Sequence, residues 1–138
     1  MDTATDFDQL LRSAAAQPQP QRLLFVFATA ELPDDATPAQ RERFAAGGGG
    51  TLSPVMCVDK GLGELSSFAA LVTESRESRE SGSAWQVVFA AGLAGRNGQE
   101  PAADQVEQAL QAMVERVRGG MIESFLALDP AGETLQFV

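Results

Sequence analysis

The stretch RLLFVFATA (residues 22–30) carries bulky apolar side chains at both odd and even positions. Because successive side chains of a β-strand point to opposite faces of the sheet, this pattern predicts an interior strand covered on both faces. WQVVFAAGLAG (residues 85–95) predicts a second interior strand. LSPVMCVDK (residues 52–60) predicts a third strand, and Pro54, which lacks an amide donor, favours its beginning or an edge position.

Helices are expected before, between and after these strands. Residues 5–16, 62–75 and 104–118 place apolar side chains at helical spacing. The last of these segments shows the clearest pattern, with Val106, Leu110, Met113, Val114 and Val117. A shorter helix is expected after Thr37, because Thr37 can cap it, Pro38 suits its first position and Gln40 completes a capping box.

Alternation of helices and strands favours the α/β class. We expect residues 1–138 to form a single α/β domain with a mixed, mostly parallel central sheet of about five strands flanked by helices. Residues 121–138 are expected to close the sheet as a C-terminal β-hairpin. The carboxyl ends of three parallel central strands would meet at one edge, where open α/β sheets usually bind ligands.

Composition excludes several classes of function. The chain has 138 residues, with 10 basic and 19 acidic side chains and a net charge of -9. This charge has the wrong sign for binding a phosphate backbone, so no nucleic-acid partner is expected. The absence of histidine excludes catalysis and zinc binding by imidazole. Without a leader or an apolar run of roughly 20 residues, the sequence predicts a cytoplasmic protein and no membrane partner.

The four glycines at residues 47–50 follow a predicted helix and precede a predicted strand. A phosphate-binding loop has the reverse order, with a strand before the glycines and a helix after them. We therefore interpret this run as a hinge that turns the chain into its next strand.

Cys57 is the candidate catalytic nucleophile, because Asp59 and Lys60 follow it and a nearby ammonium group lowers the pKa of a thiol. Strand alternation, however, places Cys57 and Asp59 on one face and Lys60 on the other. The alternative, which we favour, is that Cys57 is a buried apolar filler.

A pocket at the carboxyl edge would collect charged residues from several segments. Asp59, Lys60 and Arg96 are candidate ligand-binding residues, with the two basic side chains holding an anionic group. Gly95 belongs to the glycine-bearing turn GLAGRNG (residues 92–98), which lies between a predicted strand and a predicted helix. A plain connection between the two elements is the alternative interpretation of this turn.

Carboxylates after the first strand form the candidate metal site. Asp34 and Asp35, together with Glu31, are the type of ligand that Mg²⁺ accepts. The alternative is a solvated loop that leads into the short helix at Thr37. We expect no cofactor.

The segments QRLLFVFATAELPDDAT, MCVDK, SFAALV and WQVVFAAGLAG resemble a small bacterial family of uncharacterised proteins that carries the label ribonucleotide reductase subunit alpha. The resemblance covers most of the chain apart from residues 74–83 and implies a compact, soluble bacterial domain. It supplies no catalytic residues. The large subunit of that reductase needs a radical-bearing cysteine and a redox pair of thiols, whereas Cys57 is the only cysteine here, so we expect no reductase activity.

The pattern as a whole favours a non-catalytic protein that acts through a protein partner or by self-association as a homodimer. The C-terminal segment ETLQFV (residues 133–138) could pair as an edge strand with a second copy. The alternative is a binding protein or enzyme for a nucleotide or another small anionic molecule, with its site at the carboxyl edge of the sheet.

Overall fold

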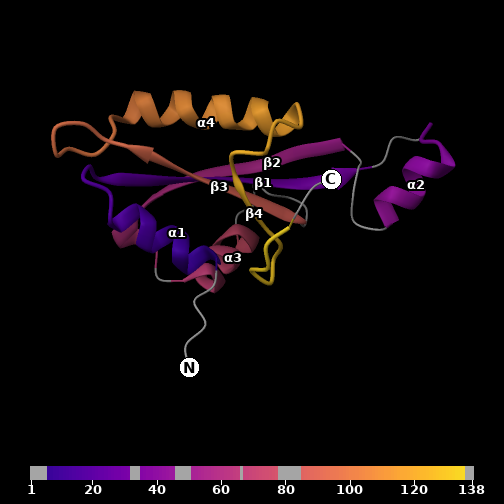
Figure 1. The fold of residues 1–138 in the computed structure, drawn as a ribbon, viewed down its shortest axis with the longest axis horizontal. Coiled ribbons are helices and arrows are strands. Elements are labelled where there is room, and N and C mark those ends of the chain that lie inside the picture. The colour runs from indigo at the N-terminus through magenta and orange to yellow at the C-terminus, as the bar shows by residue number, and fades with distance from the viewer. Residues whose placement is uncertain (1–5, 32–34, 46–50, 66, 78–84, 136–138) are drawn as a thin grey trace.

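The computed structural model describes residues 6–31, 35–45, 51–65, 67–77 and 85–135. Its strands form one antiparallel sheet in the order β2-β1-β3-β4 (Figure 1). The strands are β1 Gln21–Glu31, β2 Thr51–Gly61, β3 Val87–Ala94 and β4 Leu126–Leu128. The helices are α1 Asp6–Ala15, α2 Pro38–Ala45, α3 Phe68–Glu77 and α4 Ala103–Arg118, with the 3-10 helix η1 Leu62–Glu64 between β2 and α3.

Strand β1 is interior, as its sequence predicts. Its side chains alternate between two apolar cores, one toward α1 and α3 and the other toward α4. Figure 1 shows these helices on opposite sides of the sheet. Six consecutive residues of β1 are buried: Leu23, Leu24, Phe25, Val26, Phe27 and Ala28.

The expectation of a mostly parallel sheet of about five strands was wrong. Arg22, near the beginning of β1, pairs with Gly61 at the end of β2 and with Leu93 near the end of β3. Strand β1 therefore runs opposite to both neighbours, and β2 and β3 are parallel to each other. Only the carboxyl ends of β2 and β3 share an edge of the sheet.

The connection from β1 to β2 explains the reversal. Glu31 lies opposite Thr51, so the chain turns back at one end of the sheet and does not cross over it. Helix α2 lies in this connection, beyond the ends of the strands (Figure 1). Its sequence, PAQRERFA, has no apolar stripe, whereas a crossover helix must bury one against the sheet.

Helix α2 begins with the predicted capping box. The Gln40 N–H donates to Thr37 Oγ1 at 3.2 Å, and the Thr37 N–H donates to Gln40 Oε1 at 2.8 Å. The helix expected over residues 62–75 is divided into η1 and α3. The Ala70 N–H donates to Ser67 Oγ at 3.1 Å and so helps α3 begin at Phe68.

The described C-terminal segment forms a short version of the expected hairpin. The three residues of β4 pair with β3, and across the following turn Leu128 forms an antiparallel bridge with Thr134, while the Asp129 N–H donates to the Glu133 carbonyl oxygen at 2.9 Å. The Leu135 N–H donates to the Ala127 carbonyl oxygen at 2.9 Å. This described part of the ETLQFV segment therefore pairs within its own chain, while residues 136–138 lie outside the described residues.

Helix α4 covers one face of the sheet over β1 and β2. On the face of α4 that packs against the sheet, the buried residues are Val106, Met113 and Val117. No helix in the described part of the chain is long and apolar enough to span a membrane.

Candidate functional site between helix α4 and strand β2

A groove with a volume of about 760 Å³ lies between α4 and the edge strand β2. Strand β2 contributes Cys57 and Asp59, and β1 contributes Arg22. Pro101, just before α4, also lines the groove. Residues spaced three and four apart on α4 form the opposite side: Ala103, Val106, Glu107, Leu110, Gln111, Val114 and Glu115.

Small residues on β2 explain why this space is not filled. Cys57 lies opposite the buried Val26 and Asp59 lies opposite Leu24, so both belong to the face that α4 covers. The next residue on that face is Gly61. Cys57 and Asp59 have short side chains and Gly61 has none, so these residues leave space between β2 and α4.

The groove combines apolar and acidic surfaces. Val106, Leu110 and Val114 provide apolar surface along α4. Three carboxylates, those of Asp59, Glu107 and Glu115, line the groove with one guanidinium, that of Arg22. Asp59 pairs with Arg22 and Glu115 pairs with Arg118, and none of the described ion pairs involves Glu107. The Glu107 carboxylate favours a ligand that is apolar and carries a positive charge.

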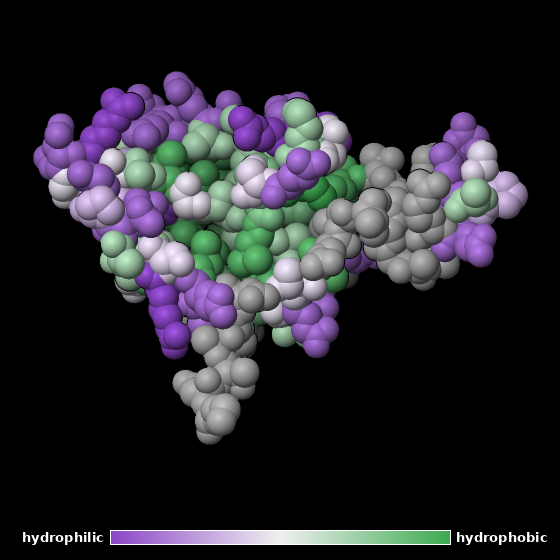
Figure 2. Space-filling view, viewed as in Figure 1, coloured by the Kyte–Doolittle hydropathy of each residue, from purple (hydrophilic) through white to green (hydrophobic). Residues whose placement is uncertain are grey.

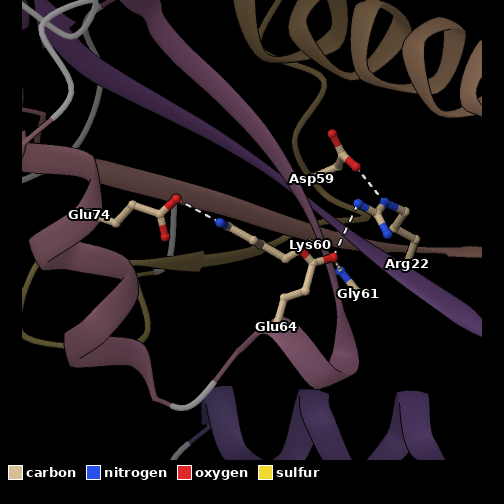
Figure 3. Close-up of polar contacts among 6 residues, drawn as sticks. All are labelled: Arg22, Asp59, Lys60, Gly61, Glu64 and Glu74. Carbon is tan, nitrogen blue, oxygen red and sulfur yellow. Dashed lines mark hydrogen bonds and ion pairs between the residues drawn. The ribbon is translucent and has the colours of Figure 1, made fainter.

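Arg22 joins three elements at one end of the groove (Figure 3). Its Nε donates to Asp59 Oδ2 on β2, and its Nη2 lies 3.3 Å from Glu64 Oε1 on η1. Glu64 Oε1 also accepts a hydrogen bond from the Gly61 N–H at 2.9 Å. The guanidinium is thus held by carboxylates of the protein itself.

The same contacts raise the pKa of Arg22 above its ordinary value. The hydrogen bond to Asp59 has the largest effect, and the charges of Asp59, Glu64 and Glu100 add to it, while burial acts in the opposite direction. Because an arginine is already protonated at neutral pH, Arg22 stays positively charged throughout the physiological range.

Lys60 lies on the opposite face of the sheet from the groove. Its Nζ is 2.6 Å from Glu74 Oε1 of α3, and Figure 3 shows the two side chains pointing toward each other. Asp59 and Lys60, which the sequence places together as ligand-binding candidates, therefore belong to two separate ion pairs.

Gly95 and Arg96 belong to a tight turn outside the groove. Arg96 and Gln99 exchange backbone hydrogen bonds of 3.1 and 2.9 Å, and Asn97 and Gly98 have φ angles of 54° and 75°. These are the features of a type I′ turn, as the Asn-Gly pair predicts. A side chain at Gly95 would collide with the Gln99 carbonyl group, so the turn itself requires this glycine. Arg96 is exposed.

The candidate metal ligands are not brought together with the candidate ligand-binding residues. Asp34 lies outside the described residues, as does the glycine run at residues 47–50. Asp35 follows the carboxyl end of β1, whereas Asp59 pairs near the amino end of that strand. In the part of the chain that the structure describes, no group of three or more acidic or cysteine side chains could hold a metal ion.

Cys57 is exposed in the groove, so its interpretation as a buried filler was wrong. The reason is that β2 is an edge strand, and one side of Cys57 faces the open groove instead of another strand. The Cys57 thiol is therefore accessible in the groove, and its reactivity can be used to detect a bound ligand.

Of the residues that line the groove, the sequence singled out only Cys57 and Asp59 as candidate site residues, and the polar residues Arg22, Glu107, Gln111 and Glu115 were not anticipated. Arg22, Leu24 and Val26 are alternate residues of β1 and therefore share one face of the sheet. Arg22 is thus a polar residue on the face that α4 covers. Glu107 and Gln111 are spaced by one helical turn beside the apolar stripe of α4. Both signals are present in the sequence, but they become informative only once α4 is known to cover β2.

Comparisons with protein-family models, curated proteins and solved structures found no match to this chain. The resemblance to the family labelled ribonucleotide reductase subunit alpha therefore stays a prediction.

Proposed function

We propose that this chain is a cytoplasmic binding protein whose α4–β2 groove holds a segment of a partner protein with apolar side chains and a lysine or arginine. The groove itself carries this proposal. Its volume of about 760 Å³ is lined by apolar side chains of α4 and by three carboxylates with one guanidinium. We infer binding, not catalysis, as the role of this chain.

The length of the groove suits a stretch of peptide. Its lining runs from Ala103 to Glu115, and at 1.5 Å per residue these twelve steps of helix span about 18 Å. An extended peptide covers this distance with about five residues. Its apolar side chains would lie against Val106, Leu110 and Val114.

The charges of the groove favour a partner segment that carries a positive charge. The Arg22 guanidinium is held by Asp59 and Glu64, so an anionic ligand would have to compete with both carboxylates. Glu107 is exposed on the outer side of the groove, where a lysine or arginine of the partner can reach it. An anionic small molecule is thus disfavoured, since Lys60 and Arg96 do not line the groove.

A neutral or cationic small molecule is the second candidate ligand. The volume of the groove lies within the range of roughly 300–1,000 Å³ that is typical of small-molecule sites. The experiments below separate a cationic ligand from an anionic one by the charge of the probe.

Two glutamines on α4 provide a matched pair of variants. Both are exposed, but Gln111 lines the groove and Gln108 does not. A short apolar peptide with one lysine, and the same peptide with glutamate in its place, are titrated against each variant by fluorescence anisotropy. We expect Gln111→Lys to weaken binding of the lysine peptide about fivefold by like-charge repulsion, and Gln108→Lys to leave it unchanged.

The single cysteine gives an independent readout. Because Cys57 is exposed in the groove, a bound peptide should slow its alkylation by iodoacetamide, which mass spectrometry follows at one site. Protection by the lysine peptide, and not by the glutamate peptide, supports the proposal. Preferential protection by inorganic phosphate or by nucleotides, strengthened in Gln111→Lys, would replace it with the anionic-ligand alternative.

A further inference from the structure

Strand β2 lies at the edge of the sheet, and two cavities border it. Among the described strands, β1 is its only neighbour. The α4–β2 groove lies on one face of β2, and a smaller cavity with a volume of about 120 Å³ lies on the other face, between β2 and α3. Cys57 lines both cavities, so they reach the edge of β2 at the same residue.

The hydrogen bonds of β1 show which backbone groups of β2 point outward. The Pro20 carbonyl oxygen accepts from the Gly95 N–H at 2.8 Å, on the β3 side. Backbone groups alternate between the two sides of a strand, so the odd-numbered residues of β1 face β2. Phe25 is one of them and lies opposite Val58. The backbone groups of Val58 thus point toward β1, whereas those of Asp59 point away from it, at the edge of the sheet.

Two residues bound this stretch of the edge. Gly61 directs its N–H outward, as Asp59 does, and donates it to Glu64 Oε1 at 2.9 Å. At the other end, Pro54 lies opposite Ala28, whose carbonyl group faces β3, so Pro54 faces the edge and has no N–H to donate. Pairing with an added strand is therefore limited to the residues between Pro54 and Gly61.

The cavity beside α3 suits one apolar side chain. The apolar residues that line it are Phe27, Met56, Val58 and Leu71. Its polar groups have partners within the protein, because Glu74 pairs with Lys60 at 2.6 Å and Ser75 Oγ accepts from Trp85 Nε1 at 2.8 Å. An uncharged side chain is therefore favoured on this face of β2.

The α4–β2 groove accepts a basic side chain in addition to apolar ones. Figure 2 shows polar side chains on the outer side of α4 and apolar surface beneath it. Glu107 is exposed at the groove, and none of the ion pairs among the described residues involves it. A lysine or arginine is therefore favoured on this face of β2.

We infer that the partner segment binds as an added strand, paired through its backbone with the edge of β2. This inference rests on the proposed function and adds the conformation and the sequence pattern of the segment. Successive side chains of a strand point to opposite faces, so alternate residues of the segment enter the α4–β2 groove and the cavity beside α3. The segment has apolar or basic residues at every second position and an apolar residue between two of them.

Backbone methylation of the lysine peptide tests the pairing. Replacing one peptide N–H at a time by N-methyl removes a donor, and only alternate residues of a strand direct their donors toward one neighbour. By fluorescence anisotropy, we expect Kd to rise about tenfold at alternate positions and less than about twofold at the positions between them. A uniform effect along a bound peptide would overturn this inference alone, whereas a peptide that does not bind would overturn the proposed function as well.

Amide hydrogen exchange in the full chain gives a second measurement. The Asp59 N–H points toward the added strand and the Val58 N–H toward β1, so saturating peptide should slow exchange of Asp59 about tenfold more than that of Val58. Equal slowing of the two amides would overturn the inference. Slowing of Asp59 that rises with protein concentration in the absence of peptide would assign the edge to a second copy of the chain and overturn it as well.

Filling the cavity beside α3 tests the second face. Val58→Phe places a larger side chain in this cavity and should raise Kd for the lysine peptide about tenfold. Val72→Phe is the matched control, because Val72 packs against the same core without lining the cavity, and it should leave Kd unchanged. Circular dichroism verifies that both variants are folded. The methylated peptides test the pairing in the unaltered protein, and unchanged affinity in a folded Val58→Phe would confine the segment to the groove and overturn the inference.

Discussion

Asp59 and Lys60 are neighbours in the sequence, but β2 directs their side chains to opposite faces of the sheet. Asp59 pairs with Arg22 in the groove, and Lys60 pairs with Glu74 of α3. The side chains of Arg22 and Asp59 are 23% and 31% exposed, so solvent screens this pair only in part. It therefore stabilises the fold more than a pair on the open surface does.

A double-mutant cycle measures this difference. Arg22→Ala, Asp59→Ala and the double variant should give a coupling energy of about 1 kcal/mol in urea unfolding. The control cycle uses Arg118 and Glu115, an i,i+3 pair with side chains 58% and 70% exposed. Its coupling should be about 0.3 kcal/mol. Equal coupling in the two cycles would contradict the structural role of the Arg22 pair.

The direction of the pKa shift gives the pH dependence of the contribution from Arg22. A raised pKa means that the protonated form is stabilised by folding, so the contribution is fully present below the ordinary arginine pKa. It is lost only as the pH rises through the higher pKa of the folded state. Raising the pH from about 7 to about 9 should therefore leave the Arg22 contribution unchanged.

At the scale of the element, α4 has two different faces. Met113 and Val117 are 3% and 0% exposed and pack in the core between α4 and the sheet. Leu110 is only partly buried and lines the groove. One helix thus supplies both the hydrophobic contact that holds it in place and the surface that we assign to binding.

Two alanine variants should separate these faces. Met113→Ala leaves a cavity in the core and is expected to lower the free energy of unfolding by about 2–5 kcal/mol. Leu110→Ala removes partly exposed surface and should cost about 1 kcal/mol. Urea unfolding of both variants checks the order. If Leu110→Ala cost as much as Met113→Ala, the groove would be closed in solution.

The whole molecule is organised around β1. This strand has a hydrogen-bonded neighbour on each side and an apolar core on each face. Strand β2 has a neighbour only on one side among the described strands. Global unfolding is therefore needed to open β1, whereas more local opening exposes the edge of β2.

Amide hydrogen exchange should follow this order. The amides of Phe25, Val26 and Phe27 are expected to exchange most slowly, at a rate set by the free energy of global unfolding. The outer-side amides of β2 should exchange much faster. Slower exchange in β2 than in β1 would contradict the strand order.

The chain's local patterns predicted most of its elements. The apolar run of β1, the helical spacing of α4 and the capping box at Thr37 are patterns formed by residues close in the sequence, so they can be recognised without the fold. Strand alternation also indicated that Cys57 and Asp59 share a face while Lys60 lies on the other, which their positions in the structure show. The exposure of Cys57 was not predictable in this way, because it depends on which strand lies at the edge.

The sequence by itself determined which segments become strands and helices and which side chains are apolar enough to be buried, because these properties repeat along the chain. Only the tertiary structure decided that β1 lies between β2 and β3 and runs opposite to both. An apolar strand presents the same pattern in either direction, so its direction depends on where the connecting chain crosses or turns back. The turn from Glu31 to Thr51 places Arg22 beside Asp59 and under α4, and this arrangement creates the groove.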